Sequence, residues 1–182
     1  MFADCSSLID APVLSATKLT DGCYANMFAE CTSLTSVPDL PATGLTERCY
    51  NNMFRGCTAL TDAPILPATT LAQYCYAGMF TNCSNLSSIN VSFNDWSDTL
   101  SATQDWVSGV AANGEFTKLE TLAEEYGDSR IPTNWNINDE EEPVIDPLTI
   151  PLTFTASGNA TIAIEKVGSP TQITLKYSKN GG

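Results

Sequence analysis

The chain contains no histidine among its 182 residues. Histidine is the commonest general base near neutral pH and the commonest side-chain ligand of metal ions. Its absence excludes Ser-His-Asp and Cys-His catalysis, and it excludes zinc sites of mixed cysteine and histidine ligands. The sequence also lacks a Gly-rich phosphate loop and a nucleophile motif. We therefore predict a protein that is not an enzyme, without catalytic residues, cofactor or metal site.

Basic residues are also few: the chain has 8 Lys and Arg against 21 Asp and Glu, for a net charge of −13. Nucleic acids and anionic membrane surfaces both bind basic proteins, so this charge argues against both kinds of partner. No apolar run approaches the roughly 18 residues of a membrane span, and we expect no direct membrane insertion. The hydrophobic content of 43% nevertheless predicts a folded chain.

What the sequence does contain is a repeat with a period of 26 residues. The positions that keep this period include Met1, Met27, Met53 and Met79, then Cys5, Cys31, Cys57 and Cys83, and then Leu8, Leu34, Leu60 and Leu86. A fixed period of this length is typical of proteins whose repeats stack and bury apolar faces against one another. The sequence therefore predicts a solenoid over residues 1–93.

Each repeat combines two local patterns. Apolar side chains of the third copy recur at i, i+1, i+4, i+5 and i+8, at Cys75, Tyr76, Met79, Phe80 and Cys83. This spacing predicts a short helix with one buried stripe. In the extended piece that precedes it, Pro64 and Pro67 forbid a helix, and each removes a backbone donor. We therefore predict one brief strand and one short helix in every unit.

The full pattern reads Leu-x-x-(Ala/Val)-Pro-x-Leu-Pro-Ala-Thr-x-Leu-x-x-x-Cys-Tyr-x-x-Met-Phe-x-x-Cys-x-x-Leu. It resembles the BspA-like (Treponema-type) leucine-rich repeats of bacterial surface proteins, with Met27-Phe28, Met53-Phe54 and Met79-Phe80 in the place of that family's Ala-Phe pair. The resemblance implies an α/β solenoid of 26-residue leucine-rich repeats, each with a short strand and a short helix. It also implies an extracellular location at a bacterial cell surface and adhesion to a host or matrix protein or a surface glycan.

The seven cysteines fall into two ladders that follow the repeat. Cys23 and Cys31 would lie about 12 Å apart along a helix, and equivalent cysteines of adjacent units about 8–10 Å apart. A disulfide needs Cα atoms within about 7 Å. We therefore predict buried free thiols, with thiolate metal ligation, redox function and bridging as the alternatives.

The repeat period stops near residue 94, and we predict that residues 94–138 form a cap on the end of the solenoid. The sequence pattern of residues 119–126 predicts a helix that ends at Gly127. The stretch is similar to segments that follow such repeats in gut-bacterial surface proteins. Its tryptophans are predicted to pack in the core, with exposed sugar-stacking platforms as the alternative; they are Trp96, Trp106 and Trp135.

The remaining chain changes composition twice. Residues 139–147 are rich in acids and proline and predict a solvated linker, with calcium binding as the alternative. Residues 148–182 predict a partial all-β, sandwich-like module. Its expected strands alternate apolar and polar or β-branched side chains, over residues 148–154, 160–165 and 171–177.

The positions that vary between units on the extended piece are the candidate ligand-binding residues: Val13, Asp39 and Ile65. The predicted function is non-catalytic recognition of a protein or glycan at a cell surface. The alternative is a phage tail-fibre or structural virion component that binds a bacterial surface. Because Met1 stands at the repeat's own methionine position, in phase with Met27, we also expect the chain to be a fragment of a longer protein.

A third function, glycoside hydrolysis by a carboxylate pair, has weaker support. Glu124 and Glu125 are the obvious pair. On the predicted helix, however, adjacent residues point apart, and a charged helix face is usually solvated. We therefore assign neither residue a catalytic role.

Overall fold

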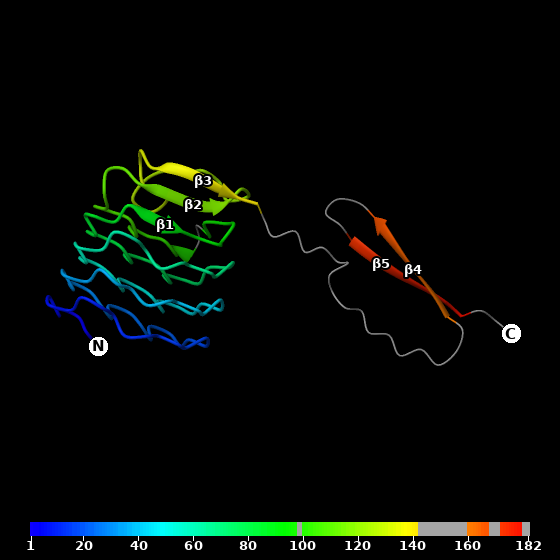
Figure 1. Cartoon of the computed structure of the whole chain (residues 1–182), viewed down its shortest axis with the longest axis horizontal. Coiled ribbons are helices and arrows are strands. Elements are labelled where there is room, and N and C mark those ends of the chain that lie inside the picture. The colour runs from blue at the N-terminus through cyan, green and yellow to red at the C-terminus, as the bar shows by residue number, and fades with distance from the viewer. Residues whose placement is uncertain (98–99, 142–159, 168–171, 180–182) are drawn as a thin grey trace. The chain divides into compact units, whose positions relative to one another are not determined.

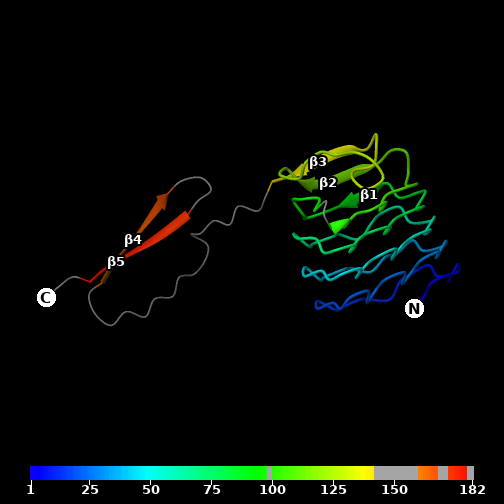
Figure 2. The same cartoon turned by 180° about the vertical axis from the view of Figure 1, so that it is seen from behind.

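The computed structural model describes residues 1–97, 100–141, 160–167 and 172–179. The chain divides into two compact units, Met1–Glu142 and Pro143–Gly182, and each is described by itself. In the first unit the chain winds in successive coils that stack on one another, from the N-terminus at one end to strand β3 at the other (Figures 1 and 2).

Regular strands of the first unit form one small parallel sheet. Its members are β1 (Ser88–Asn90), β2 (Glu115–Leu119) and β3 (Asn136–Glu140), in the order β1-β2-β3. The earlier coils meet on the same side of the stack through isolated parallel bridges, such as that between Asp10 and Ser36. The extended pieces that contain the prolines are therefore even shorter as strands than the sequence predicts.

The prediction of an α/β solenoid of leucine-rich repeats, each with a short strand and a short helix, is wrong. No α-helix occurs in the part of the chain that the structure describes, and the coils consist of turns, bridges and short strands. Residues 75–82, which were expected to be helical, form a run of turns. The helix expected over residues 119–126 is also absent, because Leu119 ends β2 and an irregular turn follows.

Backbone hydrogen bonds explain why these segments are not helical. The N–H groups of Tyr24 and Phe28 donate to the next coil, at the carbonyls of Cys49 (3.0 Å) and Met53 (2.9 Å). The N–H of Met27, between them, donates three residues back to the carbonyl of Tyr24 (3.2 Å). Alternate N–H groups thus point along the stack, whereas an α-helix would direct all of them four residues back.

A second backbone feature has the same period. Every fourth residue of the turn segments has a positive φ, between 52° and 74° in the first three segments. These residues are Gly22, Asn26 and Glu30, then Arg48, Asn52 and Gly56, and then Tyr74, Gly78 and Asn82. A left-handed residue ends a right-handed helix, and glycine and asparagine adopt this conformation most readily. The four-residue spacing of the buried stripe is therefore the period of these turns.

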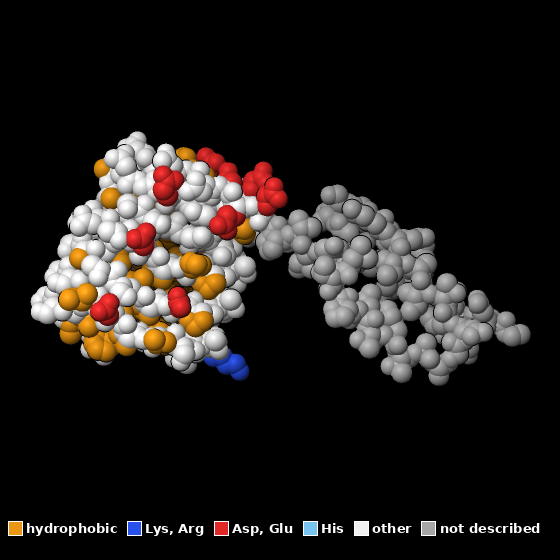
Figure 3. Space-filling model, viewed as in Figure 1, with side chains coloured by type: hydrophobic (Ala, Val, Ile, Leu, Met, Phe, Trp, Pro, Cys, Tyr) orange, Lys and Arg blue, Asp and Glu red, His pale blue; other side chains and the backbone are white. Residues whose placement is uncertain are grey.

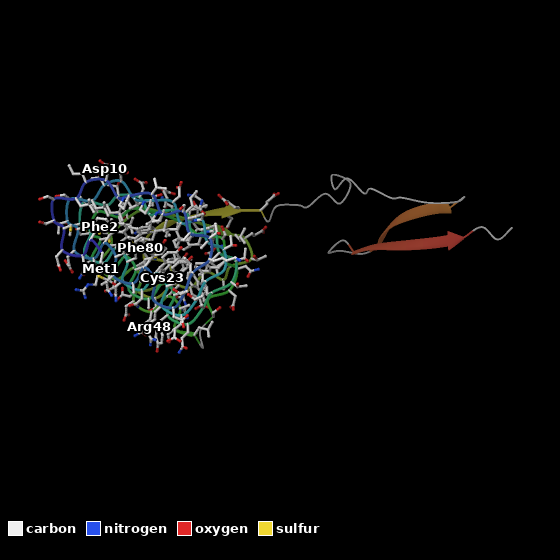
Figure 4. All side chains as sticks on the ribbon, turned by 90° about the horizontal axis from the view of Figure 1, so that it is seen from below. Met1, Phe2, Asp10, Cys23, Arg48 and Phe80 are labelled. Carbon is white, nitrogen blue, oxygen red and sulfur yellow. The ribbon has the colours of Figure 1, made fainter. Side chains whose placement is uncertain are left out.

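Stacked aromatic rings fill the interior of the coils. Phe2, Phe28, Phe54 and Phe80 form one ladder, with ring centroids of neighbours 5.6–5.9 Å apart. The tyrosines of successive coils form a parallel ladder at 5.9 Å, through Tyr24, Tyr50 and Tyr76. Figure 4 shows Phe2 and Phe80 inside the outline of the coils, with Asp10 and Arg48 at opposite edges. Each repeat thus buries its aromatic side chains against identical side chains of its neighbours.

The cysteines have a defined structural role in this interior. The Sγ of Cys57 donates to the carbonyl of Phe28 in the preceding coil at 3.1 Å, and Cys83 makes the same contact with Phe54 at 3.0 Å. All seven cysteines are free thiols. Cys5 and Cys23 are exposed, which corrects the prediction of burial for these two residues. The other five cysteines are buried, as predicted.

This distribution predicts the reactivity of the thiols. Burial raises the pKa of Cys49 to about 11 and that of Cys75 to about 12, which keeps both as unreactive thiols near neutral pH. A chromogenic disulfide reagent should therefore modify Cys5 and Cys23 rapidly in the native protein, and the other five only after unfolding. A Cys5→Ser/Cys23→Ser variant should lose the rapid phase. Rapid modification of most thiols in the native protein would contradict the buried ladders.

Stacking continues beyond residue 94. The N–H of Phe80 donates to the carbonyl of Trp106 at 2.8 Å. This contact is equivalent to the one between earlier coils in which the N–H of Phe54 donates to the carbonyl of Met79 at 3.0 Å. The residue difference is 26 in the first contact and 25 in the second, so the later coil contains one extra residue.

The three tryptophans are buried, and their indole N–H groups donate to backbone carbonyls. This burial confirms the prediction of core packing and excludes the sugar-stacking alternative.

In the described residues of the second unit, β4 (Ala160–Val167) and β5 (Gln172–Lys179) form an antiparallel pair. These strands occupy two of the three segments predicted as strands. The third, residues 148–154, lies outside the described residues. Among the described residues of both units, no helix is long and apolar enough to cross a membrane.

Candidate functional site

Two columns of outward-pointing side chains run along the side of the stack that carries the bridges and the sheet. We call this surface the β-face. Its first column consists of Asp10, Ser36, Asp62, Ser88, Glu115 and Asn136. Its second column contains Asn90, Thr117 and Asn138, which pair in the sheet, and Ile65, which adjoins the bridge between Leu66 and Val91. The 26-residue period places Asp39 and Val13 at the position of Ile65 in the two earlier coils. Parallel pairing of successive coils therefore places residues far apart in the sequence beside one another.

The first column separates its carboxylates by polar neutral residues. Ser36 pairs with Asp10 and precedes Asp62 by one repeat period, and Ser88 pairs with both Asp62 and Glu115. Because neighbouring strands lie about 4.8 Å apart, adjacent carboxylates would repel each other, and the serines keep them two strands apart. The column therefore alternates carboxylates with neutral polar side chains.

The last carboxylate of this column is held in place by amides of β3. The Nδ2 atoms of Asn136 and Asn138 donate to the two carboxylate oxygens of Glu115 at 2.8 and 3.0 Å. These hydrogen bonds, that of Asn136 first, lower the pKa of Glu115. Glu115 is exposed and stays ionised near neutral pH, so it contributes a negative charge to the β-face.

The second column contains the residues that the sequence singles out for ligand binding. Val13 is 89% exposed and Ile65 is 63% exposed, with the exposed Asp39 between them. Val13, Asp39 and Ile65 are thus all exposed, at equivalent positions of three successive repeats. Figure 3 shows acidic and hydrophobic side chains next to one another on the face of this unit turned toward the viewer.

A separate group of charged side chains lies at the end of the stack, and we call it the end cluster. It contains Lys118, Glu124, Tyr126 and Asp139. The Nζ of Lys118 lies 2.6 Å from Oδ1 of Asp139 and 4.0 Å from Oε1 of Glu124. The hydroxyl of Tyr126 donates to the other oxygen of Glu124 at 3.2 Å. Lys118 is only 2% exposed, although lysine is rarely buried in folded proteins.

The two acidic residues considered for catalysis, Glu124 and Glu125, have different partners. Glu124 faces Lys118 and Tyr126, whereas Glu125 accepts a hydrogen bond from Nε of Arg130 at 2.9 Å.

Metal ligation finds no support in the described residues. No group of three or more Cys, Asp or Glu side chains is placed there to hold a metal ion. Of the stretch considered for calcium binding, Asp139 pairs with Lys118, and Asp139 and Glu140 both belong to β3. Residues 142–147 lie outside the described residues.

Sequence reasoning missed the end cluster. Lys118 follows Phe116 by two residues in β2, so both side chains point to the interior of the stack. That alternation was visible in the sequence, but a lysine in such a position is normally read as solvated. Its acidic partner on β3, Asp139, could be identified only when the pairing register was known.

Comparisons of the chain with protein-family models, with curated proteins and with solved structures give no match. The resemblance to BspA-like repeats rests on the sequence pattern alone.

Proposed function

We propose that the protein is a non-catalytic binding protein that recognises a partner protein through the β-face. The observation that carries this proposal is the exposure of Val13, Asp39 and Ile65, two hydrophobic side chains and a carboxylate, at equivalent positions of successive repeats. Exposed aliphatic side chains beside carboxylates fit a partner surface that is both apolar and basic.

Charge favours a protein over a neutral glycan as the partner. The neighbouring column adds Asp10, Asp62 and Glu115, so a basic partner gains electrostatic attraction along the length of the β-face. A neutral glycan gains nothing from this repeated charge. An extracellular location at a bacterial surface, with a host or matrix protein as the partner, fits this chemistry and stays a prediction.

The test is a binding screen of the folded protein against matrix proteins and glycans, followed by variants. A Val13→Ser/Ile65→Ser variant should bind the protein partner at least roughly tenfold more weakly. A Thr69→Ala variant alters an exposed residue outside both columns and should bind normally. Affinity should also fall as ionic strength rises from about 0.05 to 0.5 M, because salt screens exposed charges.

Several outcomes would contradict this proposal. Equal binding by the wild type and the Val13→Ser/Ile65→Ser variant would remove the β-face as the binding surface. Binding to neutral glycans alone, without salt dependence, would favour glycan recognition. Selective binding to bacterial surface polysaccharide would favour the phage tail-fibre alternative.

A further inference from the structure

The end cluster differs in kind from the other ion pairs of the described residues. Those pairs join arginines to glutamates, at Arg48 with Glu47, Arg55 with Glu30 and Arg130 with Glu125. A guanidinium is not a nucleophile in proteins. The end cluster instead joins a lysine amine to an aspartate, and the lysine is withdrawn from water.

The pairing register of β2 and β3 places the amine of Lys118 next to the carboxylate of Asp139. Lys118 and Asp139 are direct partners in the parallel pair of β2 and β3, and Nζ lies 2.6 Å from Oδ1. The carbon that Nζ would attack, Cγ of Asp139, is bonded to this Oδ1, and two groups that the fold keeps in contact react with effective concentrations above those reached in solution. A third group is also present, because Oε1 of Glu124 lies 4.0 Å from Nζ and Tyr126 holds the other oxygen of that carboxylate.

We infer that Lys118 and Asp139 are the site of an intramolecular amide bond between the two side chains, formed with the help of Glu124. The reaction starts when the ammonium of Lys118 gives a proton to the carboxylate of Asp139. The neutral Nζ attacks Cγ of Asp139, Glu124 takes a proton from the nitrogen and returns it to the departing hydroxyl, and one water leaves. The ion pair thus becomes one amide and one water molecule, with no other reactant.

Physical reasons favour the amide over the ion pair. Holding an ammonium group away from water is costly, and its attraction to the half-exposed carboxylates of Asp139 and Glu124 repays this cost only in part. The amide carries no charge, so its formation removes that cost. The side chain of Asp139 is 47% exposed, which gives the released water a path to solvent.

The test is the intact mass of the purified full chain, measured after incubation at neutral pH and denaturation. The expected mass of the wild type is lower than the sequence mass by one water. After trypsin cuts at Arg130, the peptides on either side should remain joined. A Lys118→Arg variant keeps the charge and should show the full sequence mass, whereas Asp139→Asn should lose one ammonia in place of water.

A Glu124→Gln variant tests the proton carrier. It should form the amide more slowly by at least about a hundredfold, in line with the loss of general acid–base catalysis. A wild-type protein at its unmodified mass would overturn the inference. Loss of water that persists in Lys118→Arg would overturn it as well, because that result identifies a cyclic imide at an aspartate. Neither result bears on binding by the β-face.

Discussion

Replacement of Phe54 by alanine should lower the free energy of unfolding by about 3–5 kcal/mol, the range for deletion of a fully buried phenylalanine. The ring of Phe54 is fully buried and stacks on Phe28 at 5.6 Å and on Phe80 at 5.9 Å. Neither neighbour can fill the space, because each is held by its own coil. Because a typical domain is stable by about 5–15 kcal/mol, the change should be visible in urea unfolding monitored by tryptophan fluorescence.

Phe2→Ala is the matched control for this prediction. Phe2 belongs to the same ladder, but it stacks on Phe28 alone among the phenylalanines and is partly exposed. Its replacement should cost less than half as much as the replacement of Phe54. Equal losses for the two variants would show that stacking between coils does not carry the stability of the interior.

Replacement of Gly114 by alanine should cost roughly 2–3 kcal/mol, a typical penalty for forcing atoms into a well-packed site. A Cβ at Gly114 would lie 2.4 Å from the carbonyl oxygen of Ser87 and 2.8 Å from the ring of Trp135. The carbonyl of Ser87 accepts the N–H of Glu115 at 2.8 Å, so it cannot move without weakening the start of β2. Thermal unfolding of the variant would measure this effect.

Gly44→Ala provides the comparison, because a Cβ at Gly44 meets no atom within 4 Å. That variant should unfold within about 0.5 kcal/mol of the wild type, as expected for a surface substitution. If both glycine variants unfolded alike, the close approach of β2 to the preceding coil would not be a constraint on the fold.

The repeat could be predicted from the sequence, but the conformation within it could not be read from its apolar stripe. Cys75, Met79 and Cys83 are four residues apart, a spacing that suits both a helix of 3.6 residues per turn and a succession of four-residue turns. The two conformations are distinguished by the residues between the apolar positions. Gly78 and Asn82, which readily adopt a positive φ, fall at the same four-residue interval. Such residues at every fourth position indicate left-handed backbone and exclude a long helix.

One of the two candidate sites could be predicted from the sequence, and the other could not. The column of Val13, Asp39 and Ile65 could be found because the repeat period assigns these residues to equivalent positions. The end cluster could not, because Lys118 and Asp139 are 21 residues apart and that step is not a period of the repeat. A contact of this kind depends on where the chain turns between β2 and β3, and the pattern does not encode that turn.

The uniform contacts between coils have a consequence for how such a chain can change in length. The turn segment of each early coil donates alternate N–H groups to the next coil at the same residue offset, and each phenylalanine of the ladder stacks on another phenylalanine. Any of these coils can therefore follow any other without a new interface. Unequal crossing-over within the gene could add or remove whole coils while leaving every remaining contact intact. The length of the β-face would then be a property that mutation can adjust in steps of one coil.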